Sequence, residues 1–170
     1  GGYYRPDYND GMNKINGQYV IEELGAEEVW LWGWHYGPIE PAESNMSSPL
    51  TGDISNSERF PDDLPVYNKT YILYNYNYDR SANESVHNHG HQIEAHLSHT
   101  NQLQDYNTTL FWEKFVGSVG GAKPLGRAGD THHPPNTQQD YDYDNPTKVY
   151  SDIEDWRPDG GATIKVNNKT

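Results

Sequence analysis

The chain has 170 residues, a formal net charge of −13 and no cysteine, and 33% of its residues are hydrophobic. Five tryptophans and 14 tyrosines compensate for this low apolar content, so the composition indicates a folded domain with a polar surface. The acidic charge argues against nucleic acid and anionic membranes as partners, because both are bound through clustered basic residues. No apolar run approaches the roughly 18 residues of a membrane span.

Five segments match the acceptor pattern for N-linked glycosylation, in which serine or threonine stands two residues after asparagine. Their asparagines are Asn45, Asn68, Asn83, Asn107 and Asn168. The alternative is that these matches arise by chance in a chain rich in asparagine and threonine. We expect a secreted, extracellular glycoprotein, and the Gly-Gly start without methionine indicates a mature or trimmed product.

The first half of the chain predicts one helix and one strand before a long loop. Residues 1–18 are rich in Tyr, Asn, Asp and Gly and predict an arm or a weak helix. Residues 17–25 have helical spacing and end at a glycine, which predicts a short helix. The aromatic run at 27–37 predicts a strand buried on both faces, and its alternating tryptophans share one face. Residues 38–66 have no hydrophobic period and predict a long loop.

A second strand and a long helix are predicted next. Residues 69–79 alternate as a strand with one strongly aromatic face. A helix is expected to begin near Ser81, where Glu84 would complete a capping box. Its apolar stripe should face the sheet and consists of Ala82, Val86, Ile93 and Leu97.

The rest of the chain is expected to be less regular. Residues 108–117 predict a short helix ended by glycine. Residues 122–170 predict an irregular segment or short edge strands packed on the body, with Trp156 as an anchor among solvated acidic residues. This order of elements predicts a single α/β domain over residues 1–170, with a small mixed sheet flanked by helices and a loop-rich C-terminal third. The predicted core consists of Val29, Leu31, Ile72, Tyr74, Val86, Ile93 and Leu97.

Five of the eight histidines lie in the segment SVHNHGHQIEAHLSH, residues 85–99. On a helix, His87, His91 and Glu94 share one face, since they are spaced i, i+4 and i+7. Two imidazoles and a carboxylate form the ligand set of a catalytic zinc site. The spacing differs from His-Glu-x-x-His, so it assigns the site to no protease family. The alternative is an exposed helix without function, in which a glycan on Asn83 would crowd this face.

A second group of candidate ligands lies between residues 129 and 146. His132 and His133 precede two prolines, which predict an extended segment that fixes the direction of both rings. Asp140, Asp142 and Asp144 alternate, so on an extended strand they would project to one side and could bind calcium. The alternative is an acidic surface strand.

Six short motifs occur in a fixed order between residues 27 and 156: EEVWLWG, PAES, HGHQIEAHL, THHPPN, DYDYDNP and SDIEDW. In this order they resemble a family of secreted, mainly bacterial proteins of unassigned function. The resemblance implies a single α/β domain with a site drawn from separated motifs, formed by Glu43, His91, Glu94 and His132, with Asp155 as a further candidate. Two segments depart from the family pattern. NMSSPLTGDISNSERFPDD replaces a Gly- and aromatic-rich segment with cysteine, and residues 128–130 replace a frequent Cys-Gly-Trp.

Together, these patterns predict a hydrolase of an extracellular polymer, either metal-dependent or acid/base. Glu43, His91, Glu94 and His132 would be its catalytic residues, and His87, His91 and His132 would bind zinc or calcium. We expect His91, Glu94 and His132 to converge in one polar pocket. One alternative is a structural, self-associating glycoprotein without chemistry. The other is a glycan-binding module that uses the tryptophans of residues 27–37 as stacking platforms, so the sequence leaves open whether the protein is an enzyme.

Overall fold

The computed structural model describes residues 4, 6–33, 42–50, 52–55, 64–104, 111–117 and 126–167. The chain divides into two compact units, residues 1–96 and 97–170, and each is described by itself. The helices and the small mixed sheet confirm the predicted α/β fold class. The extent of a single domain over residues 1–170 stays a prediction. Among the described residues, no helix combines the length and the apolar character that crossing a bilayer requires.

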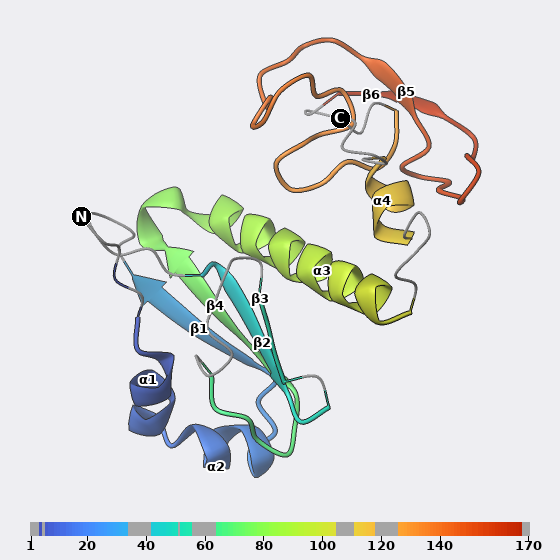
Figure 1. The fold of residues 1–170 in the computed structure, drawn as a ribbon. Helices are drawn as coiled ribbons and strands as arrows, with labels where there is room; N and C mark the ends of the chain where they lie inside the picture. Colours follow the sequence, from blue (N-terminus) through green and yellow to red (C-terminus); the bar gives the residue numbers. More distant parts are fainter. Residues whose placement is uncertain are drawn as a thin grey trace. The chain divides into compact units, whose positions relative to one another are not determined.

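The first unit is built around a four-stranded sheet. Its elements are α1 (Tyr8–Lys14), α2 (Gly17–Glu22), β1 (Glu28–Gly33), β2 (Ser44–Ser48), β3 (Gly52–Ser55), β4 (Tyr71–Asn77), η1 (Tyr78–Arg80) and the start of α3 (Ala82–Gln104). The strand order is β1-β4-β2-β3 (Figure 1). β1 runs parallel to β4, whereas β2 is antiparallel to both of its neighbours.

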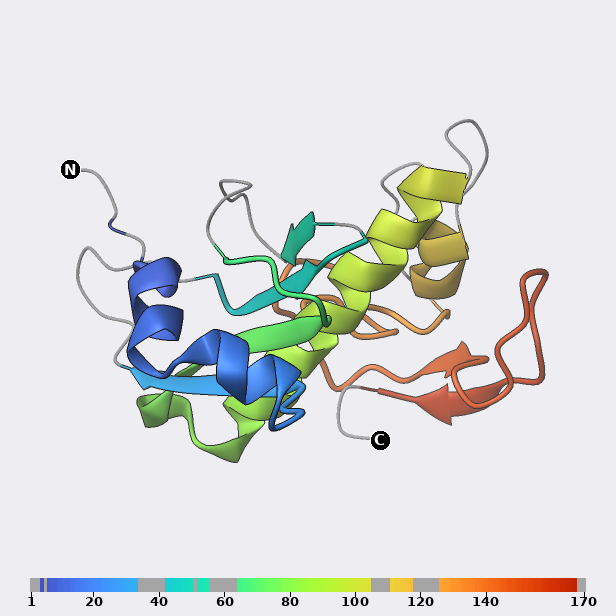
Figure 2. The ribbon, with the colours of Figure 1, turned by 90° about the horizontal axis from the view of Figure 1, so that it is seen from below.

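The apolar core lies on the face of the sheet that α1 and α2 cover (Figures 1 and 2). Asp7 caps α1, since its carboxylate accepts a hydrogen bond of 2.8 Å from the backbone N–H of Asp10. The weak helix predicted within residues 1–18 is therefore confirmed. The buried core residues are Tyr8, Met12, Ile21, Val29, Leu64, Tyr71 and Leu73.

α3 packs on the opposite face of the sheet through polar side chains. The Asn88 amide donates hydrogen bonds to the backbone carbonyls of Glu43, at 3.1 Å, and Asn75, at 2.6 Å. The ring of His89 stacks on Tyr74 with centroids 4.3 Å apart. The buried positions of this face are Glu84, Asn88, His91 and Gln92.

The predicted orientation of α3 is therefore wrong. Val86 and Ile93, which should face the sheet, are 75% and 59% exposed. The reason is that the sheet presents backbone groups of β4 and of the chain before β2 to the helix, and these groups need hydrogen-bonding partners. Of the other predicted core residues, Val29 and Tyr74 are buried, whereas Leu31, Ile72 and Leu97 are half-buried.

Three local predictions in the first unit are also wrong. The predicted loop at 38–66 contains β2 and β3, whose sequences SNMSS and GDIS lack the apolar alternation of a strand. β1 is not buried on both faces, because Trp30 and Trp32 are 53% and 54% exposed; Trp34 lies outside the described residues. The expected capping box does not form at Ser81, and Glu84 instead accepts from the backbone N–H of Asn77 at 3.3 Å.

The second unit contains α4 (Phe111–Val116) and a two-stranded antiparallel sheet of β5 (Val149–Ser151) and β6 (Ile164–Val166). The ring centroids of Trp156 and Phe115 are 5.6 Å apart within this unit. The expected role of Trp156 as an anchor to the body of the protein stays a prediction. The acidic neighbours of Trp156 are not all solvated. Asp152 is 2% exposed and pairs with Arg127 at 3.3 Å.

The acidic segment 140–144 forms turns and not the expected strand. Tyr141 has a φ of 57°, which breaks the alternation on which the calcium prediction depended. The Asp142 carboxylate accepts hydrogen bonds from the Gln138 N–H and the Asn145 amide, both at 2.9 Å. Asp142 therefore stabilises these turns.

Candidate metal site

Glu43 lies immediately before β2, and its backbone is fixed from two sides. Its carbonyl accepts hydrogen bonds from the N–H of Asn75 on β4, at 3.0 Å, and from the Asn88 amide on α3, at 3.1 Å. These bonds hold the residue between the sheet and the helix. The Glu43 side chain is 23% exposed and lies beside two histidines of α3.

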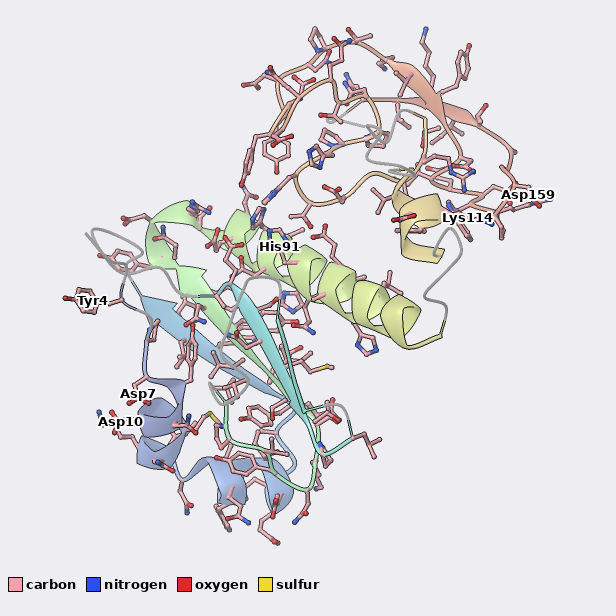
Figure 3. The ribbon with its side chains drawn as sticks, viewed as in Figure 1. Tyr4, Asp7, Asp10, His91, Lys114 and Asp159 are labelled. Atoms are coloured by element: carbon pink, nitrogen blue, oxygen red, sulfur yellow. The ribbon has the colours of Figure 1, made fainter. Side chains whose placement is uncertain are left out.

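His87 and His91 stand one turn apart on α3 and face the Glu43 carboxylate. The two Nε2 atoms are 3.0 Å from each other. The Nε2 atom of His91 lies 3.2 Å from Oε2 of Glu43, and that of His87 lies 3.6 Å from Oε1. His91 is labelled in Figure 3 and is 6% exposed. Three groups that commonly bind metal ions therefore meet at one point.

Glu94 orients the His91 ring from the other side. Its Oε2 atom is 2.9 Å from Nδ1 of His91, one turn further along α3. When the Nδ1–H group donates a hydrogen bond to this carboxylate, the ring is neutral and the lone pair of its Nε2 atom points towards His87 and Glu43. The same carboxylate–histidine arrangement orients histidine ligands in metalloproteins.

Arg80 supports the carboxylates around the histidines. Its Nη1 atom is 3.8 Å from Oε1 of Glu43 and 3.3 Å from Oε2 of Glu84. Burial raises the pKa of Glu43. The hydrogen bond with His87 and the electrostatic effects of His91, His87 and Arg80 together outweigh burial and leave this pKa below its ordinary value. Glu43 is therefore ionised at neutral pH, and a carboxylate must be ionised to bind a metal ion.

The separations between the two ring nitrogens and the two carboxylate oxygens of Glu43 are close to those around a tetrahedral metal ion. Ligands with bonds of about 2.0–2.1 Å to a tetrahedral zinc lie about 3.3–3.4 Å from one another. The separations within the group formed by His87, His91 and Glu43 are 3.0, 3.2 and 3.6 Å. The two ring nitrogens and the carboxylate are therefore spaced as ligands of one metal ion would be.

Sequence reasoning identified four of these residues and missed two. The structure brings Glu43, His87, His91 and Glu94 together. Arg80 and Asn88 were not predicted. For Arg80 the signal was its spacing of four residues from Glu84, whereas nothing in the sequence indicates that Asn88 binds the carbonyl of Glu43.

His132 lies in the second unit and not on an extended arm. Its backbone N–H donates to the Asp130 carboxylate at 2.9 Å within a turn, and its ring contacts Tyr141 at 4.2 Å. The neighbouring His133 places its two ring nitrogens 2.9 Å from Asp130 and 2.8 Å from Asp140. The convergence of His132 with His91 and Glu94 joins residues of the two units and stays a prediction.

Asp155 also lies in the second unit. Its carboxylate accepts a hydrogen bond from the backbone N–H of Ala162 at 2.9 Å and pairs with Arg157 at 3.1 Å. The first of these interactions, followed by the second, lowers the pKa of Asp155. The Asp155 carboxylate therefore stabilises the turns between Asp155 and Ala162.

The five glycosylation candidates differ in accessibility. Asn68 and Asn83 are exposed, whereas Asn107 and Asn168 lie outside the described residues. Asn45 is fully buried on β2, and its amide donates to the carbonyl of Ala42 at 3.4 Å. Burial makes Asn45 the least accessible of the described candidates, and glycosylation of the chain stays a prediction.

Comparisons of the chain with protein-family models, with curated proteins and with solved structures found no match. The resemblance to a family of secreted proteins therefore stays a prediction. The function of the site has to be argued from its own geometry and chemistry.

Proposed function

We propose that His87, His91 and Glu43 bind one zinc ion and that this site catalyses hydrolysis of an extracellular polymer. The observation that carries the proposal is the approach of two imidazole nitrogens to 3.0 Å beside a carboxylate. Two histidines and one carboxylate are a known ligand set of catalytic zinc. Calcium fits this group less well, because it prefers ligands that are all oxygen.

The burial of His91 favours a functional site and argues against the alternative of an exposed helix without function. The residue is 6% exposed, and each of its ring nitrogens faces a group of α3 or of the chain before β2. An exposed histidine without function needs no such partners. The Glu94 carboxylate, at 2.9 Å, supplies the outer contact that commonly accompanies a histidine ligand.

Three protein ligands leave a fourth position for water, which is the arrangement of a catalytic zinc site. A zinc ion lowers the pKa of bound water to about 7 and so supplies a nucleophile at neutral pH. In the hydrolysis that we propose, the water oxygen bonds to the electrophilic atom of the polymer linkage, whose bond to the leaving group breaks. One proton of the water ends on the leaving group and the other stays on the new hydroxyl, so the net reaction adds one water.

Zinc titration by isothermal calorimetry tests the metal site. We expect one ion per chain, and binding more than about a hundredfold weaker in His87→Ala, His91→Ala and Glu43→Gln, because each removes a ligand. Glu94→Gln should weaken binding by about 10–100-fold, as loss of an outer contact does. His96→Ala is the matched control, since His96 is an exposed histidine of the same helix. Equal affinities in all five variants would refute the site.

The hydrolytic step needs its own assay. Fluorescently labelled polysaccharides and proteins are incubated with the zinc-loaded chain, with the chelated chain and with His91→Ala. Release of small fragments by the zinc-loaded chain alone supports the proposal. If zinc binds stoichiometrically and no polymer is cleaved, the metal site stands and the hydrolase is refuted.

We also propose that the protein is secreted and carries glycans at Asn68 and Asn83. Both match the acceptor pattern and are exposed, on the loop before β4 and in the first turn of α3. Peptide mass spectrometry of the native protein should find modified Asn68 and Asn83 and unmodified Asn45. Unmodified peptides at both exposed sites would contradict this proposal.

A further inference from the structure

An exposed aromatic surface on β1 remains outside the proposed metal site. Trp30 and Trp32 are separated by one residue on this strand and are 53% and 54% exposed. Their register partners on β4 are Tyr74 and Tyr76, so all four side chains share one face of the sheet. Two half-exposed tryptophans side by side mark a surface that gains free energy when a partner covers it.

The tryptophans are exposed because α3 does not cover this end of the sheet. The helix packs over β4, where Asn88 bonds to the Asn75 carbonyl and His89 stacks on Tyr74. β1 lies beyond β4 at the end of the strand order. The aromatic face therefore continues past the helix onto an end strand, with Trp30 and Trp32 beyond its cover.

Both indole rings are held in place before any ligand arrives. The Trp30 ring contacts Tyr76 edge-on at 5.6 Å, and its Nε1–H donates to Glu28 at 2.7 Å. The Trp32 ring contacts Tyr76 at 4.8 Å. Tyr76 is fully buried, so it forms a fixed base under the two exposed rings. A rigid aromatic surface loses little conformational entropy on binding.

The polar groups at the edge of this surface suit a neutral ligand with hydroxyl groups. The Glu28 carboxylate lies 3.8 Å from Nε2 of His89, and both side chains are more than one third exposed. The carboxylate can accept hydrogen bonds from hydroxyls, and the imidazole can donate or accept one. The chain has a formal net charge of −13. This charge disfavours an anionic ligand such as nucleic acid.

We propose that Trp30, Trp32, Glu28 and His89 form a binding surface for a linear, neutral polysaccharide. A sugar ring has a face of C–H groups, which packs on an indole, and a rim of hydroxyls, which can reach Glu28 and His89. Residues i and i+2 of a strand are about 6.6 Å apart, so the two indoles can contact two sugar rings of one chain. The surface requires no metal ion and stands independently of the proposed function.

Calorimetry with cellohexaose and with chitohexaose, both in the presence of EDTA, tests this inference. We expect at least one hexasaccharide to bind, and the Trp30→Ala/Trp32→Ala double variant to bind it at least about tenfold more weakly. Trp30→Phe/Trp32→Phe keeps two aromatic rings and should recover part of the affinity. Tyr150→Ala is the matched control, because it removes another exposed aromatic residue, on β5.

Three results would overturn the inference. The first is the absence of binding heat with both hexasaccharides, and the second is equal binding by the parent and the double alanine variant. The third is a dimer of the parent that becomes a monomer in the double alanine variant, which would make the surface a self-association site. Circular dichroism of each variant confirms that lost binding is not lost folding. His91→Ala should bind the sugar normally, which separates this surface from the metal site.

Discussion

Replacing Asn88 by alanine tests the polar packing of α3 on the sheet. The side chain is fully buried, and its amide donates to the carbonyls of Asn75, at 2.6 Å, and Glu43, at 3.1 Å. In this variant the Glu43 carbonyl loses the hydrogen bond from Asn88 but keeps the one from the Asn75 N–H. The loss of that one bond should therefore cost only about 1 kcal/mol. The Asn75 carbonyl loses a short bond in a buried place, which should cost about 1–3 kcal/mol. We expect Asn88→Ala to lower the free energy of unfolding by about 2–4 kcal/mol, measured by urea denaturation.

Ile93→Ala is the matched control, because it shortens an apolar side chain on the other face of the same helix. Ile93 is 59% exposed, and a substitution at such a surface position changes stability by less than about 0.5 kcal/mol. If the apolar stripe faced the sheet instead, Ile93→Ala would cost about 2–5 kcal/mol. A larger loss in Ile93→Ala than in Asn88→Ala would refute the orientation of α3.

Three further predictions concern ionisation and metal binding. The pKa of Glu43 is lowered from its ordinary value of 4.5, so the stability that its carboxylate contributes is present above this pH and is lost as the pH falls through the folded-state pKa. In urea denaturation, Glu43→Gln should be less stable than the parent near neutral pH, and this difference should shrink as the pH falls below 4.5. Burial, and then Glu28, raises the pKa of Tyr74 to about 12, so its stability contribution is complete below the ordinary value of 10.0 and is lost as the pH rises towards 12. Tyr74→Phe should therefore resist alkaline unfolding better than the parent. If His132 is a ligand, His132→Ala should weaken zinc binding in calorimetry more than its neighbour control His133→Ala, and equal affinities would remove His132 from the site.

The sequence predicts the elements that have strong local signals. β4 lies within the strand at 69–79 that was predicted from an aromatic face of alternate residues, and α4 ends at Val116 before a glycine, as expected. β2 could not be predicted, because its Ser- and Asn-rich sequence has no period and the strand exists only between β4 and β3. Its pairing is a tertiary effect that overrides local propensity.

The candidate site was predicted in part because helical spacing does not depend on the packing of the helix. His87 and His91 are neighbours on any helix that includes both, and Glu94 follows one turn after His91. The helical spacing alone was therefore enough to predict that these three residues lie close together. It gave no information on their depth, and His91 belongs to the buried face of α3 and not to the flank that the apolar stripe implied.

The orientation of α3 connects the fold with the site. With its apolar stripe against the sheet, the helix would leave the carbonyls of Glu43 and Asn75 without the hydrogen bonds that the Asn88 amide donates. The polar face instead places Asn88 against these carbonyls and His91 within 3.2 Å of the Glu43 carboxylate. The same packing that fixes the backbone of Glu43 thus fixes its distance from the histidines. Because the polar face with Asn88 and His91 packs on the sheet, the opposite side of the helix, which includes Val86, is exposed.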